Sequence, residues 1–168
     1  MIFTAEKPKQ SLNKAFLKQR PLRKDIDLFK LNLIRLLGKV DEIEREENQK
    51  NHIRDFLRDT FYKESHEINT KDNKDLVIHL GKTSKENVGV IIEAKRPGNK
   101  NEMFTVERFN TKALHELILY YLDERNQTGN NEIKQLIITN VYEWFIIDAN
   151  HFDRIIYRNT KIKRLYET

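Results

Sequence analysis

The sequence predicts an α/β fold in which helices flank a mixed β-sheet. Two long segments carry apolar residues at every third or fourth position, which is typical of amphipathic helices. Several short runs of β-branched and aromatic residues, each bounded by turn-forming residues, predict strands. One helical segment separates two of these strands and can serve as a crossover. The 168 residues have room for one compact domain with at most an appendage.

The first third of the chain is predicted to be helical. Residues 11–20 predict a short basic helix that ends before Pro21. Residues 25–43 predict a long amphipathic helix, because their apolar side chains repeat at helical spacing. The apolar pattern resumes after an acidic stretch, so a second helix, or a bent continuation of the first, is expected to run to Tyr62.

The middle of the chain changes from helical to extended character. LVIHL at residues 76–80 and VGVIIEAK at residues 88–95 predict two strands, and the polar stretch between them predicts a turn. We interpret the pair as a hairpin. Residues 110–125 then predict a second clear amphipathic helix.

The last part of the chain predicts two further strands and a helix. QLIITN at residues 135–140 and YEWFIID at residues 142–148 predict strands around a short turn. HFDRIIYR at residues 151–158 predicts a closing helix. This order of elements is what leads to the expectation of a mixed sheet with helices on its faces.

Composition narrows the classes of function. There are 31 basic and 26 acidic side chains, and the resulting net charge of +5 suits a polyanionic partner, although a solvated basic surface would give the same balance. The absence of cysteine excludes a disulfide framework, a thiolate metal site and a cysteine nucleophile. The chain opens with no signal-peptide pattern, and no apolar run approaches about eighteen residues. A cytoplasmic protein without a membrane partner is therefore expected.

Two opposite charges lie in the second strand of the predicted hairpin. Glu93 and Lys95 are two residues apart, so they share one strand face with Ile91. Removing an unpaired carboxylate or ammonium from water is costly, so a purely structural strand is expected to avoid both unless they pair or hold a metal. Asp75 heads the preceding strand and can lie beside Glu93 once the hairpin forms.

Two carboxylates with an ammonium close by are typical of a site for a hard divalent cation. Mg²⁺ takes oxygen ligands, keeps several waters and polarises a phosphate oxygen, and Mn²⁺ is expected to substitute for it. Lys95 would then orient the attacking water, or help to deprotonate it, and offset phosphate charge. The alternative that the residues leave open is a salt bridge between Glu93 and Lys95 at a less buried strand end.

These residues resemble a known nuclease signature. Asp75 followed after a gap by Glu93-Ala94-Lys95 resembles the PD-(D/E)XK motif, and LIITNVYEWFIIDA at residues 136–149 resembles a strand pair of type I and type IIG restriction nuclease domains. Three further segments resemble the nuclease domain that opens single-chain type IIG restriction-modification enzymes: ENQKNHIRDFLRDTFY, EAKRPGNKNEM and KALHELILYYLDER. The similarity extends over nearly the whole chain.

The resemblance implies roles for the residues of the signature. It implies that Asp75 and Glu93 bind Mg²⁺ with the backbone carbonyl of Ala94, and that Lys95 is the catalytic lysine. The residue before Asp75 is a lysine where the signature has proline, so Asp72 stays open as the alternative acid.

Other residues are assigned more loosely. Relatives of this kind often add an acid from the preceding helix, and Glu47 is the candidate, with Glu46 as the second choice. An acid in the first turn of a helix is also favoured by the helix dipole in any protein. Arg96 and Lys100 are candidate phosphate contacts. His79 falls on the same strand face as Asp75 and could face the metal, but a solvated or hydrogen-bonded histidine is the expected role.

For the whole protein, the resemblance implies a Mg²⁺-dependent endonuclease domain of a restriction-modification enzyme that acts on double-stranded DNA. Residues 47–168 would form the PD-(D/E)XK core and residues 1–46 an N-terminal helical extension. A fragment is expected, with methyltransferase and target-recognition regions on the same full-length chain, and dimerisation on DNA is a further expectation. The alternatives are a non-catalytic nucleic-acid-binding or assembly module with the same fold, and a DNA repair-type nuclease of that fold.

Overall fold

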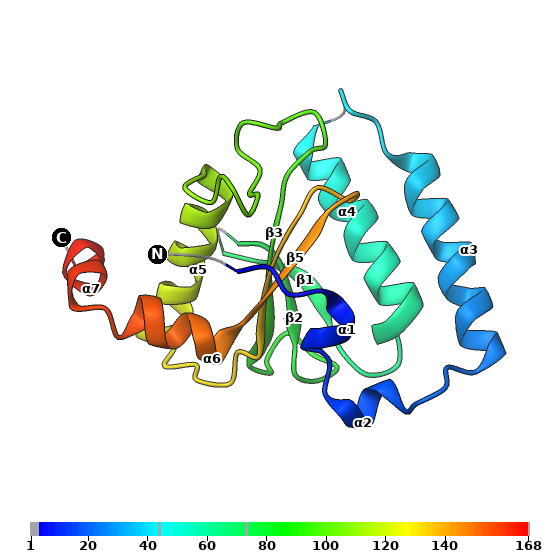
Figure 1. Cartoon of the computed structure of the whole chain (residues 1–168), viewed down its shortest axis with the longest axis horizontal. Coiled ribbons are helices and arrows are strands. Elements are labelled where there is room, and N and C mark those ends of the chain that lie inside the picture. Colours follow the sequence, from blue (N-terminus) through cyan, green and yellow to red (C-terminus); the bar gives the residue numbers. More distant parts are fainter. Residues whose placement is uncertain (1–3, 44, 73, 168) are drawn as a thin grey trace.

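The protein is built around a five-stranded mixed β-sheet with helices on both faces (Figure 1). The computed structural model describes residues 4–43, 45–72 and 74–167. The strand order is β1-β2-β3-β4-β5, in which β3 and β4 are parallel and the other neighbours are antiparallel. The strands are β1 Ile68–Lys71, β2 Lys74–His79, β3 Val88–Ala94, β4 Gln135–Thr139 and β5 Trp144–Asp148. The predicted α/β class and the β2–β3 hairpin are thereby confirmed.

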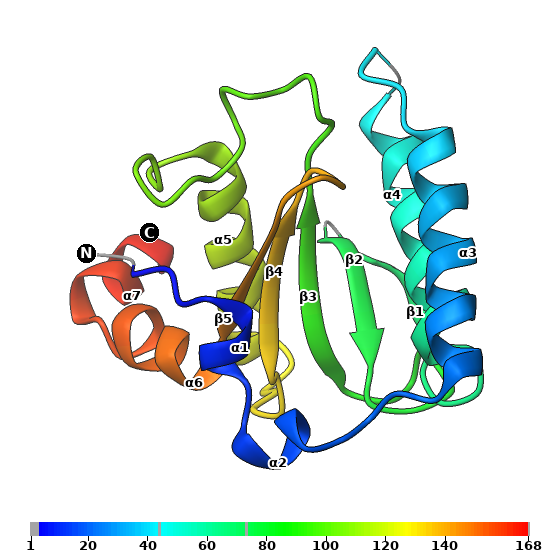
Figure 2. The same cartoon turned by 45° about the vertical axis from the view of Figure 1, so that its right-hand side comes forward.

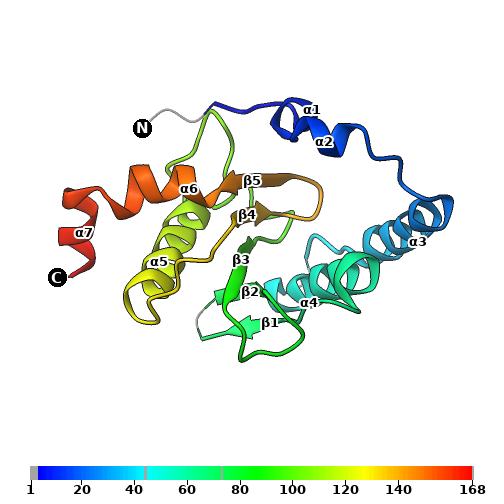
Figure 3. The same ribbon diagram turned by 90° about the horizontal axis from the view of Figure 1, so that it is seen from below.

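The helices that cover the sheet form two groups on its opposite sides (Figures 2 and 3). One group is formed by α3 and α4, and the other by α5 and the segment that begins with α6. The helices are α1 Pro8–Ser11, α2 Lys14–Leu17, α3 Arg23–Lys39, α4 Glu46–Leu57, α5 Lys112–Asn126, α6 Ala149–Phe152 and α7 Thr160–Tyr166, with π-helical turns η1 Arg58–Tyr62 and η2 Asp153–Tyr157. No helix in these described ranges is both long enough and apolar enough to cross a lipid bilayer.

Two hydrophobic cores hold the helices against the sheet. Because side chains alternate along a strand, Ile91 packs into the core under α5 and Ile92 into the core under α4. Leu117 and Phe152 belong to the first core, and Ile53 belongs to the second. Both faces of β3 are therefore buried, which explains why its sequence is almost continuously apolar.

The N-terminal part differs from its prediction. The single helix expected over residues 11–20 is replaced by two short turns of helix, α1 and α2. Leu12 is extended between them, and the side chain of Asn13 accepts a hydrogen bond from the backbone N–H of Ala15, which starts α2 separately. Neither α1 nor α2 contains a buried residue, so no packing energy favours one continuous helix.

Two elements were not predicted. β1 has the sequence INTK, in which Ile68 is the only apolar residue, and it pairs at the sheet edge opposite Ile78. α7 begins after Asn159, whose side chain accepts hydrogen bonds from the backbone N–H groups of Lys161 and Ile162. Short elements of this kind have too few residues to display a clear period.

Candidate active site

The hairpin brings the two predicted acids together at the start of β2 and the end of β3. Leu76 pairs with Ile92 in the register, and extending that register by one residue brings Asp75 opposite Glu93. The Oδ2 atom of Asp75 accepts a hydrogen bond of 2.9 Å from the backbone N–H of Ala94. Asp75 is 6% exposed and Glu93 is 0% exposed. Two carboxyl groups therefore lie side by side in the interior.

Lys95 lies at the centre of a group of acids from three elements. Its Nζ atom is 2.6 Å from Oε1 of Glu93, 2.7 Å from Oε2 of Glu116 in α5, and 3.5 Å from Oε1 of Glu46 in α4. Its backbone N–H donates to the carbonyl of Thr139 at 2.8 Å, which continues the parallel pairing with β4. Lys95 itself is 2% exposed. The ammonium is thus fixed by the sheet below it and by helices on both sides.

The second turn of α4 supplies a second lysine. The Nζ atom of Lys50 is 2.6 Å from Oδ1 of Asp75 and 3.2 Å from Oε2 of Glu47. Of the two helix acids considered from the sequence, Glu46 contacts Lys95, whereas Glu47 contacts Lys50 and projects into solvent. Glu46 is therefore the acid of α4 that lies against the predicted catalytic lysine.

Burial and charge shift the protonation of this group. Burial, with the added repulsion of Asp75, raises the pKa of Glu93 to about 9, although Lys95 opposes the shift. Burial alone would lower the pKa of Lys95, but the attraction of Glu93, Glu116 and Glu46 outweighs it and raises that pKa. Burial thus disfavours the carboxylate form of Glu93, while the surrounding acids favour the ammonium form of Lys95.

The acids fit a divalent cation in their chemistry but are not gathered around one point. Among the described residues, no group of three or more acidic or histidine side chains has the geometry of a metal site. Instead, Lys50 contacts Asp75 and Lys95 contacts Glu93. Both carboxyl oxygens of Glu93 are buried and, within the described part of the chain, neither has a well-directed hydrogen bond. Such oxygens are suited to coordinate a cation that carries its own charge.

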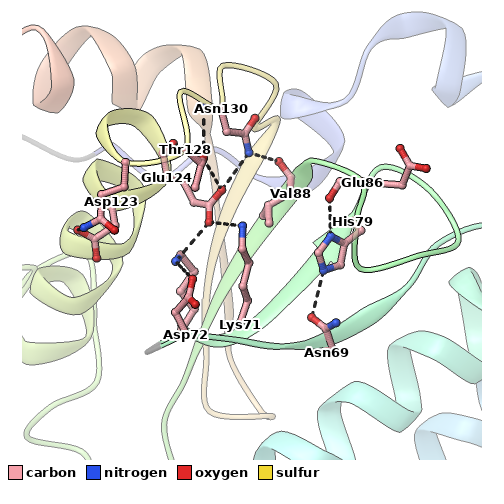
Figure 4. A network of polar contacts seen from close by, with 12 residues as sticks. Asn69, Lys71, Asp72, His79, Glu86, Val88, Asp123, Glu124, Thr128 and Asn130 are labelled. Atoms are coloured by element: carbon pink, nitrogen blue, oxygen red, sulfur yellow. Dashed lines mark hydrogen bonds and ion pairs between the residues drawn. The ribbon is translucent and has the colours of Figure 1, made fainter.

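The remaining predicted residues lie around this cluster or away from it. Arg96 and Lys100 are exposed in the segment that follows β3. Asp72 has a largely exposed side chain that contacts Lys74, so Asp75 is the acid that adjoins Glu93. His79 is buried, with Nδ1 2.7 Å from the carbonyl oxygen of Glu86 and Nε2 3.1 Å from Oδ1 of Asn69 (Figure 4). Both of its ring nitrogens are occupied, as expected for a structural histidine.

Lys50 and Glu116 are the members of the cluster that we did not predict. Each lies on the inner face of its own helix, because Lys50 is three residues before the buried Ile53 and Glu116 is three residues after the buried Ala113. The spacing of these two charged residues from apolar positions on the same helix could have predicted from the sequence that they face the sheet.

A second buried cluster on α5 has a structural role. Glu124 is 1% exposed, and its Oε1 atom is 2.8 Å from Nζ of Lys71 and 3.3 Å from Nζ of Lys74 (Figure 4). Its Oε2 atom accepts from Asn130, which also donates to the carbonyl of Val88. These contacts join β1, β2 and the loop after α5, and they pair the charge of Glu124 completely.

A family described as a domain of unknown function, DUF7149, matches residues 6–168 of the chain. No curated protein and no solved structure matches the chain.

Proposed function

The chain belongs to the DUF7149 family, and because that family's description assigns no activity, we propose a function from the site itself: a Mg²⁺-dependent DNA endonuclease domain with a PD-(D/E)XK core. The observation that carries the proposal is the convergence of Asp75, Glu93 and Lys95 within one hairpin. Asp75 adjoins Glu93, and Lys95 lies 2.6 Å from Glu93. Burying three ionisable groups together is costly, so the arrangement calls for a chemical reason.

The surrounding charges support a cation site in an otherwise basic protein. The chain carries a net charge of +5, yet carboxyl groups outnumber ammonium groups around the hairpin. The carboxyl groups are those of Glu46, Glu47, Asp75, Glu93 and Glu116, and the ammonium groups are those of Lys50, Lys95 and the more exposed Lys112. An acidic centre within a basic surface suits a divalent cation together with a phosphate backbone.

In this proposal the residues divide the work of phosphodiester hydrolysis. Asp75, Glu93 and the carbonyl of Ala94 would hold Mg²⁺ or Mn²⁺, which supplies Lewis-acid polarisation of a phosphate oxygen. Lys95 orients a water molecule toward phosphorus and offsets negative charge as the water adds and one P–O ester bond breaks in line. The proton that the water loses passes to the leaving oxygen by way of solvent. Glu116 and Glu46 keep the ammonium of Lys95 charged and in place.

The wider setting follows from the resemblance to restriction enzymes. We propose that the domain acts in the cytoplasm on double-stranded DNA, as part of a restriction-modification protein with methyltransferase and target-recognition regions on the same full-length chain. Dimerisation on DNA belongs to the same proposal. A repair-type nuclease of the same fold would use the same three residues, and only the segments outside them favour the restriction assignment.

A second candidate function is a non-catalytic nucleic-acid-binding or assembly module. One observation favours it: Lys50 and Lys95 already pair with the buried acids, so the cluster can be neutralised without any ligand. In that case the charges would serve only to hold α4 and α5 against the sheet.

Plasmid cleavage by the 168-residue chain separates the two candidates. We expect nicking or linearisation in Mg²⁺ or Mn²⁺, loss of cleavage in EDTA, and a loss of at least about a hundredfold in Lys95→Ala. Lys112→Ala is the matched control, because Lys112 contacts Glu116 from a side chain that is 56% exposed. Equal cleavage by wild type and Lys95→Ala, with both variants folded by circular dichroism, would support the non-catalytic module instead.

A further inference from the structure

Lys50 forms an ion pair with one carboxylate oxygen of Asp75. Its Nζ atom is 2.6 Å from Oδ1 of Asp75, and the other oxygen, Oδ2, already accepts from the N–H of Ala94. The side chain of Lys50 is 16% exposed and that of Asp75 is 8% exposed, so this ion pair is largely shielded from water. Both oxygens of Asp75 therefore have partners within the protein.

Lys50 also has a second acid at the surface. Its Nζ atom is 3.2 Å from Oε2 of Glu47, whose side chain is 64% exposed. A lysine side chain has four flexible methylene groups, so a small rotation can move the ammonium from Asp75 toward Glu47 without leaving it unpaired. Glu47 thus offers an alternative position for the charge one helical turn away from Lys50.

Lys95 lacks this freedom. It contacts Glu116 and Glu46 in addition to Glu93, and those two acids come from helices on opposite sides of the sheet. Its ammonium stays fixed even if Glu93 takes another partner. The two lysines of the cluster are therefore not equivalent: Lys95 is held in place and Lys50 can exchange.

We propose that Lys50 is an internal counter-ion of Asp75 that a divalent cation displaces, and that Glu47 retains the lysine after displacement. The inference rests on the proposed function, since it takes Asp75 as a metal ligand. An ammonium in contact with Oδ1 competes directly with a cation for the same oxygen. Lys50 thereby lowers the affinity of the site for metal, and Glu47 restores part of that affinity by holding the displaced charge.

Mn²⁺ binding to the 168-residue chain without DNA, measured by calorimetry at one pH and ionic strength, tests this competition. Lys50→Met removes the charge and keeps a long stem, and we expect it to bind Mn²⁺ at least about tenfold more tightly than wild type. Glu47→Gln is expected to bind Mn²⁺ more weakly, because Lys50 then has only Asp75 as a partner. In the Lys50→Met background, Glu47→Gln is expected to have little further effect.

Lys112→Met is the matched control for charge alone. It removes a lysine that contacts Glu116 but not Asp75, so a gain in affinity equal to that of Lys50→Met would contradict a specific role for Lys50. Thermal melting in EDTA establishes that each variant is folded.

The outcomes separate the inference from the function on which it rests. If wild type binds Mn²⁺ and Lys50→Met binds no more tightly, the counter-ion role is overturned while the metal site stands. If Glu47→Gln weakens binding equally with and without Lys50, Glu47 acts on the metal directly and the exchange is wrong. If Asp75→Asn binds Mn²⁺ as tightly as wild type, or if no variant binds it, the proposed metal site itself fails.

Discussion

Glu93 is the residue at which burial and charge conflict most strongly. Its pKa rises from an ordinary 4.5 to about 9, because burial and Asp75 disfavour the carboxylate. The folded state therefore binds its proton more tightly than the unfolded state, and the stability gained below the unfolded pKa is lost as pH rises toward 9. Glutamine is neutral at every pH. We expect Glu93→Gln to be more stable than wild type by about 1 kcal/mol or more at pH 8, with the difference shrinking toward pH 5 and vanishing below about pH 4.

Urea unfolding in EDTA at pH 5 and pH 8 measures this effect. Glu116→Gln is the control of opposite sign. Burial raises the pKa of Glu116, but its hydrogen bonds and the nearby charges of Lys95 and Lys112 together outweigh burial and lower that pKa. Removing that carboxylate should destabilise the protein at pH 8. A Glu93→Gln effect that is the same at pH 5 and pH 8 would mean that Glu93 ionises normally in the folded protein.

The sequence identifies the residues that lie in one hairpin more readily than those that reach it from elsewhere. Asp75 and Glu93 are separated by one turn, so strand periodicity and pairing are sufficient to bring them together. Glu116 and Lys50 come from helices whose docking depends on packing in both cores, and that packing has no short-range signature in the sequence. Glu47 and Glu46 are adjacent in the chain, and only the rotation of α4 decides which one meets Lys95.

Among the elements, the turn between β4 and β5 supports the site from the side of the parallel strand pair. Val141 has a φ of 77°, a left-handed conformation that is strained for a β-branched residue. Oγ1 of Thr139 accepts a hydrogen bond of 3.0 Å from the N–H of Val141, and Nε1 of Trp144 donates one of 2.8 Å to the carbonyl of Val141. The carbonyl of Thr139 in turn accepts from the N–H of Lys95. Thr139 and Trp144 thus hold a tight turn beside β3.

Trp144→Phe tests how much the turn depends on the indole hydrogen bond. The substitution keeps an aromatic ring and removes the donor to Val141, so we expect a loss of about 1 kcal/mol in the free energy of unfolding. Tyr142→Phe in the same turn is the control, since Tyr142 is 56% exposed and should change stability by less than about 0.5 kcal/mol. A urea midpoint for Trp144→Phe equal to that of wild type would show that other contacts hold the turn.

At the scale of the whole molecule, positive charge is distributed so that phosphate contacts can be tested separately from catalysis. Arg96 and Lys100 are exposed in the segment after β3, next to the acid cluster. Lys161 and Arg164 are exposed in α7, which lies on the opposite side of the molecule from α4 (Figure 1). Replacing either pair with alanine removes two positive charges, but from different places on the surface. Comparing the two double variants therefore distinguishes a specific DNA-binding surface from a general attraction of DNA to the net positive charge.

We expect Arg96→Ala/Lys100→Ala to weaken DNA binding to a similar extent for unrelated sequences. Each lost phosphate contact removes about one unit from the slope of log affinity against log salt, so the slope should become shallower by about two. Fluorescence anisotropy with two unrelated duplexes, in Ca²⁺ to prevent cleavage, measures both quantities. Lys161→Ala/Arg164→Ala should leave the slope almost unchanged. If the α7 pair reduces the slope as much as the pair beside the acid cluster, DNA is attracted by the net charge of the protein, and the segment after β3 has no special part in positioning the phosphate at Lys95.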